Sequence, residues 1–192
     1  MTAEIALNDS FLIAMPGMLD PTFERAVVYV CEHSTKGALG LVITRPTDLT
    51  LDTLFERIDL KLEIDVLSSE SVLFGGPVQT ERGFVLHRAN DEEYSSSVHV
   101  NDSIRLTTSK DVLQALSDGH GPDKMLVTLG YAGWQAGQLE DEIAANGWLT
   151  VKTNNDSVER ILFDTPVDDR YTEAVKLLGF DPAMLSGEAG HA

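Results

Sequence analysis

Short apolar runs, separated by glycine, proline and polar residues, dominate the first half of the chain. Residues 26–33 are rich in β-branched and aromatic side chains, which is typical of a buried strand. A polar turn at 34–37 separates them from the apolar run 39–44, so the two runs are predicted to pair as antiparallel strands. Further strands are predicted at 11–14, 71–74, 83–87, 98–100, 104–107, 125–129 and 149–153.

The pattern takes on the period of a helix at a few places, most of them in the second half of the chain. Leu51, Leu54, Phe55 and Ile58 follow the i, i+3, i+4, i+7 spacing of an amphipathic helix, and Thr50 is placed to cap it. Later helices are predicted after Thr108, before Gly147, after Asp156, and from Asp168 or Asp169 to Gly179. Strands gather early and helices late, without regular βαβ alternation. This order favours an α+β fold with a largely antiparallel sheet and about four helices, mostly in the C-terminal half.

The length of 192 residues and the 43% hydrophobic composition suit one globular domain with its own core. No segment has the composition of a linker, so we expect a single domain over 1–185. Residues 186–192 are small and polar, and they are expected to form a flexible tail.

The segment 128–149 joins an apolar strand to an acidic helix and carries both tryptophans of the chain. The strand is predicted to stop at a glycine turn over 130–134. At the end of the helix, Gly147 fits the left-handed C′ position, and Trp148 fits the next one, where an apolar side chain packs back on the helix. A glycine turn before a helix suits an anion, but the acidic residues 140–142 would repel a phosphate. The segment is predicted to be either a binding site or a well-specified piece of the core.

Three glycine-containing turns, at 15–18, 75–77 and 130–134, each follow an apolar strand. Glycine leaves the backbone open to close approach, and strand ends of one sheet can converge on a common pocket. The predicted ligand-binding residues are therefore Met15, Pro16, Gly75, Gly76, Pro77, Tyr131 and Trp134. The alternative is that these turns are sheet corners and that the methionine fills a gap in the core.

Cys31, His33 and His87 are the candidates for catalysis. A cysteine and a histidine can form an activated nucleophile, and the i, i+2 spacing of Cys31 and His33 predicts side chains on one face of a strand. Such neighbours stand about 7 Å apart, too far for a direct hydrogen bond, and a lone cysteine in an apolar strand is usually a buried hydrophobe. His87 is typical of a polar residue at a strand end. The histidine and cysteine spacings match no metal site, so no metal is expected.

The 14 basic and 31 acidic residues give a net charge of −17, which argues against direct binding of nucleic acids. A single cysteine excludes a disulfide scaffold and fits a reducing compartment. The chain has no positively charged leader and no apolar run of the roughly 20 residues that cross a membrane. We therefore expect a cytoplasmic protein without membrane contact. It carries no phosphate-loop or dinucleotide-binding motif, and no cofactor is expected.

Together, these motifs resemble one family, the YqgE/AlgH family of small bacterial proteins. The resemblance covers nearly the whole chain, in order. It is carried by FLIAMP (11–16), DPxF (20–23), VVYVCEH (27–33), GGP (75–77), RGFVLH (82–87), TTS (107–109), LGYAGW (129–134), GQLE (137–140) and AGHA (189–192). The resemblance implies a single α+β domain with coiled, partly antiparallel sheets. It implies no catalytic residues, although some members carry the description of a transcriptional regulator.

These observations favour a non-enzymatic binding or regulatory protein that acts through a protein or small-molecule partner. One alternative is a hydrolase or transferase with Cys31, His33 or His87 in its site. The other is a DNA-binding regulator, which the net charge disfavours and for which the chain shows neither a helix-turn-helix nor a basic arm.

Overall fold

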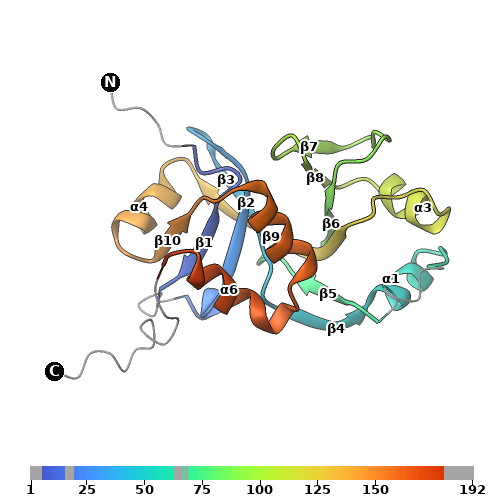
Figure 1. The fold of residues 1–192 in the computed structure, drawn as a ribbon, viewed down its shortest axis with the longest axis horizontal. Helices are drawn as coiled ribbons and strands as arrows, with labels where there is room; N and C mark the ends of the chain where they lie inside the picture. The colour runs from blue at the N-terminus through green and yellow to red at the C-terminus, as the bar shows by residue number, and fades with distance from the viewer. Residues whose placement is uncertain (1–5, 16–19, 63–66, 68, 180–192) are drawn as a thin grey trace.

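The computed structural model describes residues 6–15, 20–62, 67 and 69–179, which fold around a curled β-sheet (Figure 1). The strands are β1 (Phe11–Ala14), β2 (Val27–Ser34), β3 (Gly37–Val42), β4 (Pro46–Thr50), β5 (Ser71–Phe74), β6 (Val78–Arg88), β7 (Ser97–His99), β8 (Ile104–Thr107), β9 (Met125–Gln135) and β10 (Trp148–Val151). Among the described residues, the α-helices are α1 (Leu51–Arg57), α3 (Asp111–Ser117), α4 (Gln138–Ala144), α5 (Asn155–Glu159) and α6 (Arg170–Lys176). A π-helical segment (Arg160–Asp164) continues α5.

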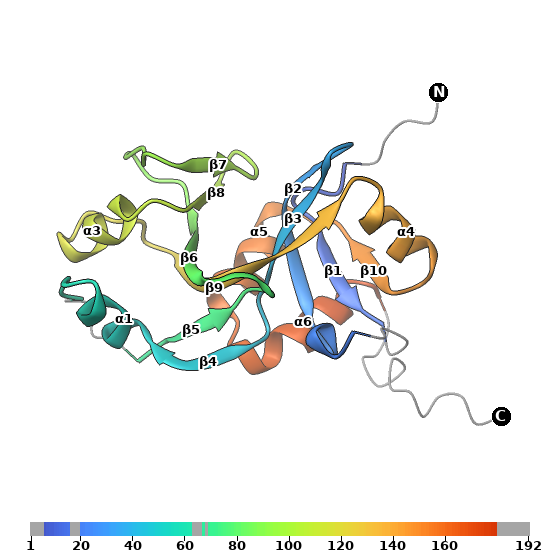
Figure 2. The same cartoon turned by 180° about the vertical axis from the view of Figure 1, so that it is seen from behind.

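The long strand β9 joins the two parts of the sheet. In the order β10-β1-β2-β3-β9-β6-β8-β7, it lies between β3 and β6, and its first half also pairs with β5. The β5–β9 pairing is parallel, and the other strand pairs of the described residues are antiparallel. Figures 1 and 2 show β1, β2, β3 and β10 on one side of the molecule, and β6 to β8 with α1 and α3 on the other. The predicted α+β fold, with a largely antiparallel sheet and mostly C-terminal helices, is confirmed.

The predicted hairpin of the N-terminal third is also confirmed. β2 and β3 pair antiparallel, with Tyr29 opposite Leu41 and Ser34 opposite Gly37 at the turn. Gly37 takes φ 135°, which allows the tight reversal at the tip of the hairpin. Two apolar runs around a polar turn are sufficient to predict this hairpin, because both strands and their connection lie within one short stretch of sequence.

The turn predicted at 130–134 is wrong, because β9 continues through these residues to Gln135. Gly130 takes φ 77°, in the left-handed region that favours glycine, and it bends the strand without ending it. Beyond the bend, Gly133 pairs with Leu39 of β3. The glycines therefore belong to a strand that changes partners, and local sequence does not distinguish that role from a turn.

Two helix ends differ from the prediction. Asn146, with φ 63°, takes the left-handed position after α4 in place of Gly147, and the Gly147 amide donates to the Glu142 carbonyl at 2.9 Å. Asparagine tolerates this conformation because its short polar side chain bonds locally. The cap of α5 is Asn154, whose side chain accepts from the first turn, so Asp156 lies inside the helix.

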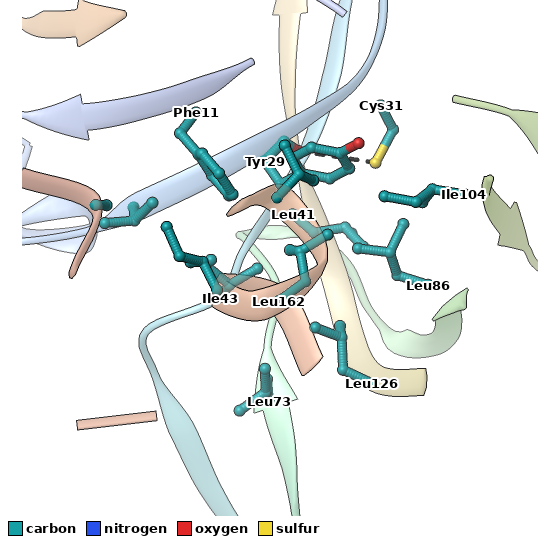
Figure 3. Close-up of a cluster of buried hydrophobic side chains, with 14 of the residues drawn as sticks. Phe11, Tyr29, Cys31, Leu41, Ile43, Leu73, Leu86, Ile104, Leu126 and Leu162 are labelled. Atoms are coloured by element: carbon teal, nitrogen blue, oxygen red, sulfur yellow. Dashed lines mark hydrogen bonds between the residues drawn. The ribbon is translucent and has the colours of Figure 1, made fainter. Parts of the chain in front are cut away.

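Apolar side chains pack in three clusters against the faces of the sheet. The first lies between the sheet and the C-terminal helices and includes Phe11, Tyr29 and Cys31 (Figure 3). The second lies on the opposite face of β1 and β2, under α4, and contains Trp134 and Trp148. The third lies under α1 and α3 against β5, β6 and β9. Because the centre of the sheet is covered on both faces, accessible functional groups lie at strand ends, hairpin tips and helix surfaces.

Candidate functional site

Two of the three predicted binding turns meet, and they meet backbone to backbone. The Gly75 amide donates to the Leu129 carbonyl at 2.9 Å, and a side-chain carbon on Gly76 would lie 2.1 Å from the Tyr131 carbonyl carbon. Such close approach leaves no room for a ligand between the two segments. Pro77 follows on the exposed surface. The glycines therefore allow the two chain segments to cross in close contact.

Met15, the described residue of the third predicted turn, lies elsewhere on the sheet. Met15 donates its amide to the Gly147 carbonyl at 3.0 Å, beside the end of β1. Gly75 lies next to Val42 of β3, so β3 and β2 stand between it and β1, a separation of about 14 Å at roughly 4.8 Å per strand. Pro16 and the rest of this turn lie outside the described residues. Met15, the described residue of the turn, is therefore separated from Gly75 and Gly76.

The two aromatic residues of the 130–134 segment point to opposite faces of β9. Tyr131 packs edge-on against Phe84 at 5.3 Å between ring centroids, and Trp134 packs against Trp148 at 6.2 Å. A shallow concavity of about 520 Å³ passes over this part of β9 and the tip of the β2–β3 hairpin, and its lining includes Tyr131, Trp134, Lys36 and Leu39. Tyr131 and Trp134 thus adjoin a surface depression, although the indole itself is buried.

The indole N–H of each tryptophan is hydrogen-bonded within the protein. Trp134 Nε1 donates to Glu142 Oε2 at 2.7 Å, and Trp148 Nε1 donates to the same oxygen at 2.9 Å. Gln138 Nε2 donates to Glu142 Oε1 at 3.3 Å. The sequence analysis does not name Glu142 as a functional residue. The sequence does place it on the predicted helix that lies between the two tryptophans, and this position is what points to a shared contact.

The structure separates Cys31 from His33. The register of β2 and β3 shifts between Val30 and Glu32, so a bulge at Cys31 interrupts the alternation of side chains. Cys31 lies in the first cluster, whereas His33 pairs with Ala38, which packs on the second cluster under α4. The prediction that the two side chains share a face is therefore wrong. A bulge depends on the partner strand, and its position is not visible in the β2 sequence.

The Cys31 thiol is enclosed by the core. The side chain is 2% exposed, and its sulfur lies 3.7 Å from the Tyr29 carbonyl oxygen (Figure 3). Burial raises the pKa of the thiol well above its ordinary value, so the thiolate that a nucleophile requires is disfavoured.

His33 instead links the N-terminal segment to α4. Its Nδ1 accepts from the Leu7 amide at 3.1 Å, so the ring proton of the neutral form is on Nε2, which donates to Glu140 Oε1 at 2.5 Å. The hydrogen bond from His33 lowers the pKa of the Glu140 carboxyl, which keeps the carboxylate charged. These residues lie along a groove of about 770 Å³ between α4, the tip of the β2–β3 hairpin and the N-terminal segment. Its lining is Ala6, Leu7, His33, Ser34, Thr35, Gly137, Glu140, Ile143, Ala144 and Thr150.

His87 ends a chain of hydrogen-bonded hydroxyl groups. The ring is 1% exposed, and its Nδ1 donates to the Arg88 carbonyl at 2.9 Å, which leaves Nε2 to accept from Thr107 Oγ1 at 2.7 Å. Thr107 Oγ1 in turn accepts from Ser97 Oγ at 2.6 Å. Burial lowers the pKa of His87 and favours the neutral ring. Ser97 is half-buried and lines a polar pocket of about 170 Å³ together with Tyr94, His99 and Arg105, among other residues.

In the described part of the chain, the His, Cys, Asp and Glu side chains form no group of three that could hold a metal ion. None of the helices in the described ranges combines the length and the apolar character that crossing a membrane requires.

Comparison with known proteins places the whole fold in a family. The model of a family described as AlgH-like matches residues 11–183. The UPF0301 protein RSc0675 of Ralstonia nicotianae is 60% identical over 190 residues, covering 99% of this chain and 97% of its own length. The UPF0301 protein Bpet0561 of Bordetella petrii is 63% identical over 185 residues, covering 96% and 89%.

Solved structures agree with these sequence relatives. The solution structure of the AlgH protein from Pseudomonas aeruginosa matches with a TM-score of 0.78 and 42% identity, covering 100% of this chain and 99% of that one. The crystal structure of protein DIP2367 from Corynebacterium diphtheriae matches with a TM-score of 0.61 and 19% identity over 79% of this chain and 78% of that one, which shows a shared fold. From the family match, the relatives and the AlgH structure, this chain belongs to the YqgE/AlgH family.

Proposed function

We propose that this chain is a non-enzymatic, cytoplasmic binding or regulatory protein, and that its partner, a protein segment or a small molecule, binds in the groove beside α4. The observation that carries this proposal is the groove itself. Its volume of about 770 Å³ lies within the range of roughly 300–1,000 Å³ that small-molecule sites occupy. This groove replaces the three glycine turns as the proposed site.

The lining of the groove has the composition expected of a binding site. Ile143 and Ala144 provide apolar surface beside the mostly buried Leu7, and the hydrogen-bonded pair His33 and Glu140 provides a polar group at a defined position. His33 is fixed by two hydrogen bonds, one to the N-terminal segment and one to α4. An apolar surface with a few oriented polar groups gives affinity together with a preferred orientation of the ligand.

Capture from cell extract tests the proposal. Ala144 is exposed and lines the groove, whereas its neighbour Ala145 is exposed outside the groove lining. In Ala144→Arg, the new side chain lies one helical turn from Glu140 on the same wall of the groove, where it pairs with the carboxylate and covers the apolar surface. Wild-type protein and Ala145→Arg are expected to retain the same proteins or metabolites, and Ala144→Arg is expected to lose them. Equal retention by both variants, with unchanged thermal unfolding, would place the partner elsewhere.

A second candidate function, group transfer by a serine nucleophile, rests on the hydroxyl chain at His87. Ser97 donates to Thr107, which donates to the neutral His87 ring. In such a reaction the Ser97 oxygen would attack the carbonyl carbon of an ester while its proton passes to Thr107 and the Thr107 proton passes to His87 Nε2. The bond from that carbon to the alkoxy group would then break, and the alcohol would leave with the proton from His87. A water molecule would attack the acyl-Ser97 ester, pass its proton back along the same path, and release a carboxylic acid and free Ser97.

A fluorophosphonate probe tests this second candidate. It is expected to label Ser97, with loss of labelling in Thr107→Val because the proton path is broken. The neighbouring hydroxyl of Ser95, which lines the same pocket and bonds to Asp111, is the internal control. Absence of labelling in the wild-type protein, or equal labelling of Ser95 and Ser97, would eliminate the serine nucleophile.

A further inference from the structure

The described residues that line the groove beside α4 include one carboxylate and no lysine or arginine. The carboxylate is that of Glu140. Both ring nitrogens of His33 are already hydrogen-bonded, Nδ1 to the Leu7 amide and Nε2 to Glu140. Lys36, on the same hairpin, lines the separate depression over β9. The net charge of the whole protein, −17, adds to the negative electrostatic potential at the groove.

The Glu140 carboxylate retains capacity for a ligand. Its side chain is 47% exposed, and the contact with His33 uses Oε1. A carboxylate has lone pairs for about four hydrogen bonds, so one bond from His33 leaves room for donors of a ligand. The same bond holds the carboxylate in one position at the wall of the groove.

An apolar surface continues from this carboxylate. Ile143 and Ala144 lie on α4 within one turn of Glu140, and Leu7 faces them from the N-terminal segment. A hydrocarbon body against these residues would gain burial, while an ammonium group at Glu140 would gain charge complementarity. A carboxylate or phosphate at the same place would meet like charge.

We infer that the groove binds a small amphipathic cation, an organic ammonium ion whose hydrocarbon body lies along Leu7 and Ile143 and whose ammonium group contacts Glu140. The inference rests on the proposed function, since it requires the groove to be the binding site. It adds the chemical class of the ligand: apolar body, positive head, and a size that fits about 770 Å³.

Three probes of equal chain length test the inference: octylammonium, octanol and octanoate, each titrated below its aggregation concentration into the full chain and followed by amide chemical shifts. Octylammonium is expected to shift residues of the groove and to bind about tenfold more tightly than octanoate, with octanol between them. Glu140→Gln keeps an acceptor for His33 and removes the charge, so it is expected to weaken octylammonium about fivefold and to leave octanol unchanged.

Asp141→Asn is the matched control, because it removes the same charge from the next, exposed residue of α4 outside the groove lining. It is expected to change octylammonium binding less than twofold. An equal loss in Asp141→Asn and Glu140→Gln would show attraction to the overall charge and would overturn the inference. An equal affinity for all three probes, or a preference for octanoate, would also overturn it while leaving the groove as a site.

Failure of the proposed function is distinguished by the capture experiment. If none of the probes shifts groove residues but Ala144→Arg still loses the captured partner, the inference is wrong and the groove remains the proposed site. If wild-type protein and Ala144→Arg retain the same molecules, the proposed function fails and the inference fails with it.

Discussion

Trp134 and Trp148 donate their indole N–H groups to the same carboxylate oxygen, Oε2 of Glu142. The rings also pack edge to face, with centroids 6.2 Å apart. One acidic residue of α4 thus satisfies two buried donors that come from different strands, β9 and β10. The packing of α4 on the sheet, and with it the wall of the proposed groove, depends on this shared acceptor.

Replacing Glu142 is therefore expected to destabilise the protein. In Glu142→Ala, two indole donors lose their partner at positions where the tryptophans are 7% and 2% exposed, which should cost about 2–4 kcal/mol of unfolding free energy. Glu142→Gln retains an acceptor oxygen without the charge and should cost less. Urea unfolding measures both, and Asp141→Ala on the exposed side of α4 is the control. A loss in Glu142→Ala no larger than in the control would show that the shared acceptor is not stabilising.

A second prediction concerns the crossing of Gly76 over β9. Gly76 has φ 151°, and a side-chain carbon there would lie 2.1 Å from the Tyr131 carbonyl carbon, so Gly76→Ala is expected to cost about 3 kcal/mol or more. At Gly83 in β6, a side-chain carbon would meet no atom within 4 Å, so Gly83→Ala is expected to stay within about 0.5 kcal/mol. Thermal or urea unfolding of the two variants compares them directly. Similar stabilities would contradict the close crossing.

The chemical accessibility of Cys31 gives a third prediction. Since the thiol is 2% exposed and burial raises its pKa, iodoacetamide is expected to leave the native protein unmodified and to label it fully in concentrated urea. Intact-mass measurement over time follows the reaction. Rapid labelling of the native chain would instead restore Cys31 as a candidate nucleophile.

Burial of Cys31 and Tyr29 also predicts how stability depends on pH. Burial raises both pKa values above their ordinary 9.0 and 10.0, and the hydrogen bond from Tyr29 to Asp9, 2.5 Å long, raises that of Tyr29 further. The folded state therefore keeps protons that the unfolded chain releases. The stabilisation is complete below about pH 9 and is lost as pH rises, by about 1.4 kcal/mol per pH unit for each group.

Urea unfolding between about pH 7 and about pH 11 checks this dependence. In Cys31→Ala the decline is expected to begin about one pH unit later than in the wild-type protein, at the ordinary pKa of Tyr29. Identical pH profiles for the two proteins would mean that Cys31 titrates alike in the folded and unfolded states.

Local sequence patterns predict the fold well where the residues that contact one another are close in sequence. The hairpin of β2 and β3 follows from two apolar runs around a polar turn, and α1 follows from the spacing of Leu51 and Phe55. The prediction was wrong where a distant segment decides the outcome. Gly130 bends a strand because Gly76 crosses it, and the bulge at Cys31 exists because β3 sets the register.

The proposed site could not be found from the sequence for the same reason. His33 and Glu140 are 107 residues apart and meet only because α4 folds back beside the β2–β3 hairpin. The sequence indicates His33 through its spacing from Cys31, and it indicates Glu140 only as a charge near the start of a helix. The sequence shows both residues, but only the tertiary fold shows that they are in contact.

The double pairing of β9 has a consequence for synthesis of the chain. The first half of β9 pairs with β5 and β6. Its second half pairs with β3, where Gly37 lies opposite Gln135. Until β9 leaves the ribosome, the inner edges of β3 and β6 both lack their neighbour, and neither half of the sheet can close. Between the synthesis of β6 and that of β9, the nascent protein therefore carries two open strand edges, and one later strand seals both.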